Sequence, residues 1–182
     1  MNVPGENLLL QIDDIFTLDE CKMLIDHANA VGYQSVDRGN AVYNRVVGRV
    51  SIRGKPLHDY LWDTLRHHIP SHVNGKRVIG LNDYFRFSKY YTGQFFDVHK
   101  DGINQDSNGN RSALTLNIFL NDDFEGGETD FLNSSNPLDL RFSVKPKPGR
   151  GALFFAQQYH RGNRILSGEK YLIRTDVMVA DF

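Results

Sequence analysis

His99, Asp101 and His160 are residue types that together can hold a catalytic metal ion. In an extended strand residues i and i+2 point to one face, so His99 and Asp101 can present an imidazole and a carboxylate to a single point. Two histidines and one carboxylate with open positions opposite them are the usual ligands of non-haem Fe(II) sites that activate oxygen. His160 is the candidate second histidine, although a lone histidine beside aromatic residues is more often packed or exposed than metal-bound.

Lys170 and Arg174 could hold an anionic cosubstrate at such a site. They lie at i and i+4 of a predicted strand and therefore on one face. A keto acid that chelates iron and carries a second carboxylate needs a buried cation at its far end, and both side chains suit that role. The pattern does not decide between them. An equally good interpretation is that both are ordinary basic residues on a strand that faces solvent.

Composition and length indicate one domain of an ordinary globular protein. The chain has 182 residues, which suits a single sizeable core. Its 21 Lys and Arg nearly balance 22 Asp and Glu, so no net field favours nucleic acid, and nucleic acid is unsupported as a partner. The lone Cys21 cannot form an internal disulfide, and no apolar run predicts a leader or membrane span. We therefore expect a reduced, cytoplasmic protein without a membrane partner; its oligomeric state is unspecified.

Residues 1–81 are predicted to form a helical supporting region with a few strands. Thr17 and Glu20 have capping-box spacing ahead of a helix that Gly32 would end. Pro56 predicts the start of a second helix, whose apolar face would run to Ile69 before Pro70 ends it. Apolar and branched residues predict strands over 7–11 and 43–52.

Residues 82–182 are predicted to form the catalytic core, built from strands separated by polar turns. The predicted strands cover 84–91, 113–120, a segment closing at Phe131, 151–156 and 170–179. Several strands at this spacing, with helices gathered at the front, favour an antiparallel sandwich or barrel over alternating strand and helix units. The predicted fold class is mainly β with supporting helices (α+β), with a double-stranded β-helix (jelly-roll, cupin-like) core.

Three blocks carry a resemblance to a known family. They are Y-Y-T-G-Q-F-F-D-V-H-K-D-G at 90–102, L-T-L-N-I-F-L-N-D-D-F-E-G-G-E-T-D-F at 114–131 and H-R-G-N-R-I-L-S-G-E-K-Y-L-I-R-T-D-V-M-V at 160–179. In this order they resemble the prolyl 4-hydroxylase-like 2-oxoglutarate- and Fe(II)-dependent dioxygenases. The resemblance implies that His99, Asp101 and His160 are the iron ligands and that Lys170 binds the side-chain carboxylate of 2-oxoglutarate. Arg174 is a second candidate for that carboxylate.

The remaining pocket residues follow from the resemblance and from strand alternation. Tyr90 matches the tyrosine that borders the family's cosubstrate. On the strand 113–120, alternation places Thr115, Asn117 and Phe119 on one face, which should line the pocket. Where better-known prolyl hydroxylases often carry a tyrosine that bonds the cosubstrate, this chain has Phe119, so Asn117 or Arg174 would take up that role.

The family reaction would use Fe(II), 2-oxoglutarate and O2, with ascorbate as an optional addition. It would hydroxylate a substrate and release succinate and CO2. Two alternatives are a metal-binding jelly roll with chemistry that needs no 2-oxoglutarate, and a non-catalytic binding module.

The substrate itself is not specified by these motifs. A peptide or protein side chain and a small molecule are both compatible partners. Asn44, Arg45, Arg49 and Arg86 could meet an acidic or amide substrate, and ordinary surface ion pairs are the competing interpretation.

Overall fold

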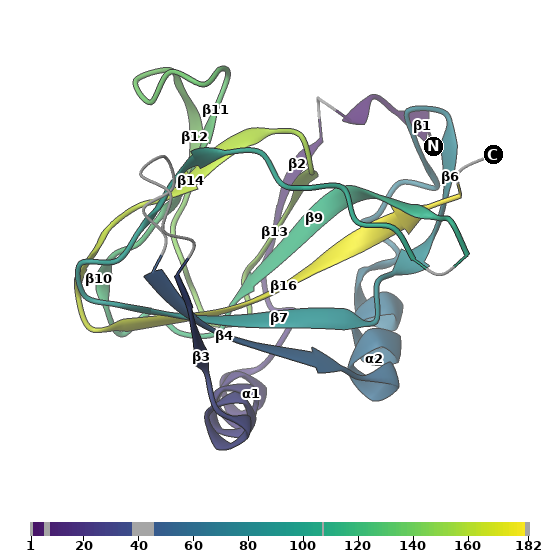
Figure 1. Cartoon of the computed structure of the whole chain (residues 1–182). Helices are drawn as coiled ribbons and strands as arrows, with labels where there is room; N and C mark the ends of the chain where they lie inside the picture. The colour runs from purple at the N-terminus through teal and green to yellow at the C-terminus, as the bar shows by residue number, and fades with distance from the viewer. Residues whose placement is uncertain (1, 6–7, 38–45, 107, 181–182) are drawn as a thin grey trace.

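A computed structural model describes residues 2–5, 8–37, 46–106 and 108–180 of the chain (Figure 1). Two helices and many short strands alternate with turns, as expected for a mainly β protein. The helices are α1 (Leu18–Val31) and α2 (Lys55–Leu65). The strands are β1 (Asn2–Val3), β2 (Leu9–Ile12), β3 (Gln34–Asp37), β4 (Val46–Arg53), β5 (His72–Val73), β6 (Lys76–Leu81), β7 (Tyr84–Tyr91), β8 (Phe96–His99), β9 (Arg111–Phe119), β10 (Glu125–Gly126), β11 (Thr129–Leu132), β12 (Leu140–Val144), β13 (Gly151–Phe155), β14 (Tyr159–Gly162), β15 (Ile165–Ser167) and β16 (Glu169–Val179).

The first helix begins and ends where its sequence signals predict. The Thr17 hydroxyl accepts from the backbone N–H of Glu20, and the Glu20 carboxylate accepts from the backbone N–H of Thr17 at 2.7 Å. This reciprocal capping box satisfies two donors that a helix start leaves unpaired. Gly32 ends the helix with φ of 96°, a conformation that glycine adopts without strain.

The second helix is shorter than the predicted one. It carries Pro56 in its first turn but ends at Leu65, before Ile69. The ring of Pro70 would clash with the carbonyl of Arg66, four residues earlier, so the helix cannot continue up to the proline. Residues 66–69 form a turn, and Ile69 is still buried in the core.

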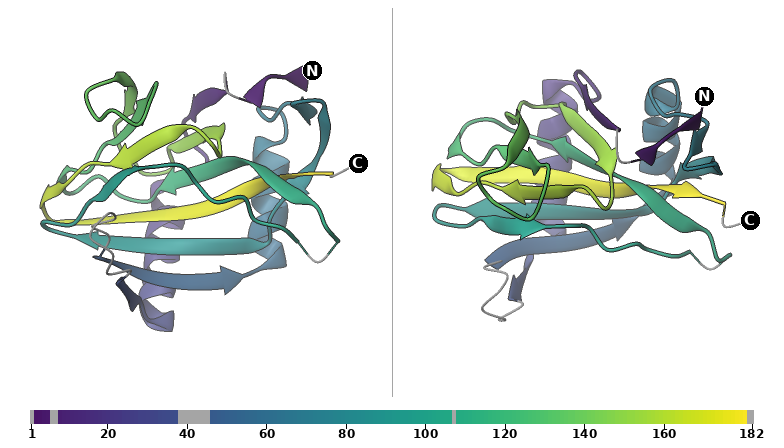
Figure 2. Two further views of the ribbon diagram at one scale, coloured as in Figure 1. Left: turned by 45° about the horizontal axis from the view of Figure 1, so that its top comes forward. Right: turned by 90° about the horizontal axis from the view of Figure 1, so that it is seen from above.

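Two mainly antiparallel sheets form the body of the protein, with a short parallel pair, β1 and β5, at the edge of the larger one and a separate two-stranded sheet of β10 and β15 (Figure 2). In the larger sheet, β16 lies between β9 and β7, and β4 continues outward from β7. The smaller sheet has the strand order β12-β11-β14-β8. The supporting region contributes strands as well as helices, because β2, β4 and β6 pair with β13, β7 and β16. Strands β7, β9, β13 and β16 of the later region therefore share one sheet with strands from the front of the chain.

The larger sheet has a helix-covered face and a pocket face. On β9, Leu114, Leu116 and Ile118 belong to the same apolar cluster as the buried side chains of α1 and α2. Phe119 instead packs in a second cluster, with Phe131 from the smaller sheet. Figure 1 shows both helices beside β4 and β7, away from β11, β12 and β14. The predicted alternation along this strand is confirmed, and it leaves the other face free to carry a site.

No helix among the described ranges is long and apolar enough to cross a membrane.

Candidate active site

His99 and His160 face each other across a pair of antiparallel strands. The register of β8 and β14 places His160 directly opposite His99, and the two ring centroids are 4.1 Å apart. Phe96 stacks on the ring of His99 with centroids 3.5 Å apart, and Phe154 meets that of His160 edge-on at 4.7 Å. Strand pairing thus joins two histidines that are far apart in sequence, and aromatic neighbours limit how their rings can turn.

Asp101 reaches the same point by a different route from the predicted one. β8 ends at His99, so strand alternation does not place Asp101. Residues 156–158 form a turn just before β14, the strand that pairs with β8, so no strand position lies opposite Asp101. Instead the backbone N–H of Asp101 donates to the Ala156 carbonyl at 2.9 Å, and the Gln157 side-chain amide donates to the Asp101 carbonyl at 2.7 Å. These two bonds hold the carboxylate beside the histidines.

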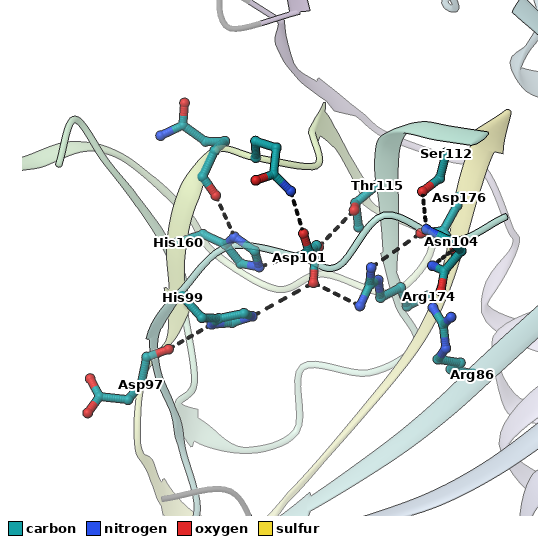
Figure 3. A network of polar contacts seen from close by, with 12 residues as sticks. Arg86, Asp97, His99, Asp101, Asn104, Ser112, Thr115, His160, Arg174 and Asp176 are labelled. Carbon is teal, nitrogen blue, oxygen red and sulfur yellow. Dashed lines mark hydrogen bonds and ion pairs between the residues drawn. The ribbon is translucent and has the colours of Figure 1, made fainter. Parts of the chain in front are cut away.

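Both histidines are oriented by backbone carbonyls (Figure 3). The Nδ1 atom of His99 lies 2.7 Å from the carbonyl of Asp97, and that of His160 lies 2.9 Å from the carbonyl of Gln158. A carbonyl only accepts, so each Nδ1 carries the proton and each Nε2 keeps its lone pair. Metal-bound histidines in proteins are usually held in this way by an outer partner.

The three side chains converge tightly. Nε2 of His99 lies 3.8 Å from Oδ1 of Asp101, and Nε2 of His160 lies 3.7 Å from Oδ2. One ligand atom from each of the three residues lies within 4.8 Å of the others. The Asp101 carboxylate also accepts from the Thr115 hydroxyl at 2.7 Å and forms an ion pair with the Arg174 guanidinium at 2.8 Å. A divalent ion between these atoms would meet a two-histidine, one-carboxylate face.

The environment favours the protonation states that metal binding requires. Burial lowers the pKa of His99 to about 3 and lowers the pKa of His160 as well. Burial would raise the pKa of Asp101, but the charge of Arg174 and the hydrogen bond from Thr115 act against it, and that pKa stays below its usual range. Neutral imidazoles and an ionised carboxylate are the ligand forms that a divalent metal takes.

The triad lines a pocket that holds most of the other predicted site residues. Tyr90, Asn117, Lys170 and Arg174 are among its lining residues, and it encloses about 600 Å³ of empty space, part of it open to solvent. Two of the predicted site residues, Thr115 and Phe119, lie beneath the surface of the pocket and do not line it. Thr115 is fully buried and bonds Asp101, and Phe119 is fully buried beneath Lys170, whose Nζ is 5.0 Å from the ring centroid. The predicted face of β9 does point to the pocket side.

A family model described as the 2OG-Fe(II) oxygenase superfamily matches residues 85–175, half of the chain. The chain belongs to the 2OG-Fe(II) oxygenase superfamily. The matched span includes His99, Asp101 and His160, the same three side chains that the structure brings together. The protein is therefore an enzyme of this superfamily, as its motifs predict. No curated protein matches the chain by sequence.

Solved structures with the same fold include several prolyl hydroxylases. The collagen prolyl hydroxylase of Paramecium bursaria Chlorella virus-1, in its 2OG complex, aligns with a TM-score of 0.71 and 22% identity over 94% of this chain and 96% of that one. A Pseudomonas putida prolyl-4-hydroxylase aligns with a TM-score of 0.66 and 14% identity, over 93% and 91%. A Trichoplax adhaerens prolyl hydroxylase, in complex with a hypoxia inducible factor peptide fragment, aligns with a TM-score of 0.70 and 16% identity, over 93% and 82%. These likenesses confirm the double-stranded β-helix fold.

Lys170 and Arg174, the two cationic side chains that could bind the cosubstrate of this 2OG-Fe(II) oxygenase, differ in their surroundings. Arg174 already bridges two carboxylates, because it lies 2.8 Å from Asp101 and 3.2 Å from Asp176. Lys170 is buried and forms an ion pair with no carboxylate of the described residues; its Nζ donates to the Gly127 carbonyl at 2.5 Å. Burial lowers the pKa of Lys170 to about 7. Of the two, Lys170 is the cation with no carboxylate in ion-pair contact among the described residues, and the charge of Glu128 acts on it only from a longer distance.

Several buried polar atoms that line the oxygenase pocket form no hydrogen bond with the described residues. Among the described residues, four buried side-chain atoms have no hydrogen-bond partner. Three of them belong to the pocket lining: Nε of Arg49, Oδ1 of Asn117 and Nε of Arg174. The fourth is the hydroxyl of Tyr33, outside that lining. Because buried polar groups are normally satisfied, this concentration fits a pocket whose remaining partners come from bound molecules.

Sequence reasoning missed two residues that support the site. Asp176 is buried and accepts from Asn104 at 2.7 Å as well as pairing with Arg174. An acidic residue two positions after Arg174, inside an apolar strand, was an available signal. Gln157, which holds the Asp101 carbonyl, carried no signal, because its role depends on where the turn after β13 lies.

The candidate substrate residues have mixed outcomes. Arg49 and Arg86 both line the pocket, and Arg86 lies 3.5 Å from the Asp176 carboxylate. Asn44 and Arg45 lie outside the described residues.

Proposed function

We propose that this enzyme hydroxylates its substrate with Fe(II), 2-oxoglutarate and O2, releasing succinate and CO2. His99, Asp101 and His160 would hold the metal, and Lys170 would receive the side-chain carboxylate of 2-oxoglutarate. One juxtaposition carries the proposal. The same pocket contains two neutral histidines with one ionised carboxylate and a buried lysine that forms no ion pair with the described residues. A dicarboxylic keto acid could bind the metal through its keto-acid end and the lysine through its other carboxylate.

The residues present fit both groups. The Nε2 lone pairs of the histidines and the Asp101 carboxylate converge on one point. Bound there, iron would supply oxygen activation coupled to decarboxylation of the keto acid, which is chemistry that no side chain can provide. The protein's own contribution is to orient the ligands, bind the cosubstrate and exclude water.

The cosubstrate end of the pocket is built for a carboxylate. The Lys170 ammonium has two further protons to donate besides the one bonded to Gly127. The rings of Phe119 and Tyr90, with centroids 5.0 Å and 5.9 Å from Nζ, shield this charge from water and strengthen its attraction for an anion. The amide of Asn117 can turn its NH2 group to the same ligand, in place of the missing tyrosine hydroxyl.

We infer that the substrate is a prolyl peptide or a small molecule related to it. This rests on the fold shared with prolyl hydroxylases, one of which is in complex with a peptide fragment. Ascorbate enters the proposal as an optional reductant that keeps iron ferrous.

An anaerobic titration tests the proposal directly. Purified protein loaded with Fe(II) should develop a visible charge-transfer band when 2-oxoglutarate is added, since only a keto-acid chelate gives one. With air and a panel of peptides and amino acids, the loaded protein should form succinate together with a product heavier by one oxygen. Absence of the band, or succinate formation without Fe(II), would count against this function.

Single-domain organisation and a cytoplasmic location complete the proposal. The lone Cys21 is free and buried, and burial raises the pKa of its thiol to about 11, so it is protected in a reduced state. Cell fractionation with an antibody to the chain tests the location, and one cooperative unfolding transition is expected of one domain.

A further inference from the structure

Arg49 is a pocket cation that neither the triad nor the cosubstrate uses. It lies on β4, outside the span matched by the family model, and lines the pocket. Its Nε–H is buried and meets no acceptor among the residues the structure describes. A guanidinium is always charged, so a buried N–H without an acceptor is unfavourable until something accepts from it.

The register of the larger sheet fixes where Arg49 points. Arg49 lies opposite Ser88 on β7, and Ser88 lies opposite Leu172 on β16. Two residues further along these strands, in the next pair that points to the same face, Arg86 lies opposite Arg174. Residues paired across strands share a face, as do residues i and i+2. Arg49 therefore lies on the same face as Arg174, one row away and two strands further out.

The charges of the pocket do not balance without an additional anion. Among the residues that the structure describes, the lining has four cationic residues, Arg49, Arg86, Lys170 and Arg174, and a single acidic residue, Asp101. Asp176, behind the wall, pairs with Arg86 and Arg174. The cosubstrate would satisfy Lys170. Arg49 then remains without a carboxylate, since it forms no ion pair within the described part of the chain.

We propose that Arg49 receives a carboxylate of the substrate, held by the planar fork of its guanidinium. The inference rests on the proposed function and narrows its substrate class to acids. Two sources have this chemistry: the α-carboxylate of a free amino acid, and an acidic group of a peptide close to the hydroxylated carbon. Arg86, on the neighbouring strand, adds a second positive charge beside the same anion.

Acetate is a suitable probe because it does not have to be a substrate. Protein loaded anaerobically with Fe(II) and 2-oxoglutarate is paramagnetic, so the relaxation of acetate methyl protons reports acetate that binds close to the metal. We expect saturable relaxation by acetate, much weaker relaxation by neutral acetamide, and an unchanged charge-transfer band. Arg49→Gln should weaken acetate binding by at least about tenfold, as loss of a hydrogen bond to a charged group implies.

Arg53→Gln is the matched control. Arg53 lies on β4 at i+4 from Arg49, but it is exposed and paired with Asp83 at 2.6 Å. This variant should bind acetate as the wild-type protein does. Equal acetate relaxation in wild type and Arg49→Gln would overturn the inference, because the anion would then bind elsewhere, for example on the metal itself. If wild type gives no charge-transfer band, the proposed function fails instead, so the two failures are distinct.

Succinate formation then separates the two sources of the carboxylate. One arm compares free amino acids with their carboxamides, and the other compares capped peptides with and without one Asp or Glu beside the target residue. In the arm that supports turnover, the acidic form should exceed the neutral form by at least about tenfold in kcat/KM, and Arg49→Gln should remove the difference. Equal turnover of acidic and neutral forms would contradict the inference. If neither arm supports turnover, the acetate result decides.

Discussion

The three metal-ligand side chains, His99 on β8, His160 on β14 and Asp101 just after β8, all have protein partners. Carbonyls hold both Nδ1 atoms, and Thr115 and Arg174 hold the two oxygens of Asp101. The basic wall of the same pocket consists of Arg49 on β4, Asn117 on β9, and Lys170 and Arg174 on β16. Several of its polar groups have no hydrogen-bond partner among the described residues. Nε of Arg49 and Oδ1 of Asn117 are buried and unpaired, and Lys170 bonds one carbonyl.

The contrast separates two ways of building a binding site. A metal needs ligands in place before it arrives, so the triad is oriented by bonds that folding itself forms. An organic anion brings its own acceptors, so the basic wall can leave its donors free and its charges unbalanced. Substitutions on the triad side should therefore change metal binding first, and substitutions on the basic wall should change ligand binding first.

Asp101→Ala should have the largest effect. It removes the one anionic ligand, leaves the Thr115 hydroxyl without its acceptor and leaves Arg174 with Asp176 alone. Turnover should fall by about three orders of magnitude or more. Fe(II) affinity, measured by anaerobic titration, should fall with it, while circular dichroism remains that of a folded protein.

Asp19→Ala is the control for this loss, since Asp19 is exposed in the first turn of α1. Turnover retained in Asp101→Ala would remove the triad from the centre of the mechanism.

Lys170→Met should have the next largest effect, and it should fall on the cosubstrate. Loss of a charged hydrogen bond in a buried site should weaken the binding of 2-oxoglutarate by about a hundredfold, whereas the affinity for Fe(II) should change little. The charge-transfer titration measures both. An unchanged 2-oxoglutarate affinity would return Arg174 to consideration as the carboxylate's partner.

The pKa of Lys170, which burial lowers to about 7, adds a pH signature. Above this value the empty site holds a neutral lysine, which must gain a proton to bind a carboxylate. The Kd for 2-oxoglutarate should therefore rise with pH above 7, by up to about tenfold per unit. Lys170→Arg should flatten the dependence, because arginine stays charged.

The same pKa predicts how stability depends on pH. Between about 7 and the ordinary lysine value of about 10.4, the unfolded chain binds more protons at this position, so the ligand-free protein gains stability as pH rises. Urea unfolding at several pH values measures this gain, and its absence in the wild-type protein, or its persistence in Lys170→Met, would contradict the lowered pKa.

Local signals and strand periodicity allowed the sequence to predict much of the fold. The capping box at Thr17 and the alternation that separates Leu116 from Asn117 depend on neighbours within a few residues, and both are confirmed. The end of α2 was misplaced because the proline's clash acts four residues earlier than its own position.

The parts of the site that sequence reasoning could not reach depend on non-local pairing. His160 lies opposite His99 because of a strand register, and register is set by the whole sheet rather than by the two segments. The choice between Lys170 and Arg174 depends on Asp176 and Asp101 folding against one of them. Strand alternation places both cations on one face and cannot show which one already has a partner.

Arg174→Gln tests the boundary between the two sides of the pocket, because Arg174 lies on the basic wall but bonds a triad residue. Loss of its bond to Asp101 should lower Fe(II) affinity by about 10- to 100-fold, as for other outer partners of metal ligands. At saturating Fe(II), the 2-oxoglutarate affinity should change less than in Lys170→Met. Arg53→Gln again serves as the arginine control. The reverse pattern, a large cosubstrate effect with normal metal binding, would move Arg174 into the ligand-binding group.

Thr17→Ala should have the smallest effect, and it tests whether the contrast belongs to the pocket alone. The substitution removes one half of the capping box on α1, on the far side of the larger sheet from the pocket. Loss of an N-cap of this type costs about 1 kcal/mol of unfolding free energy, which lowers the Tm of a domain this size by about 2–4 °C. Calorimetry should show that decrease while Fe(II) and 2-oxoglutarate affinities stay at their wild-type values. A change in either affinity would mean that helix packing sets the register of β9 and β16, and that both sides of the pocket depend on it together.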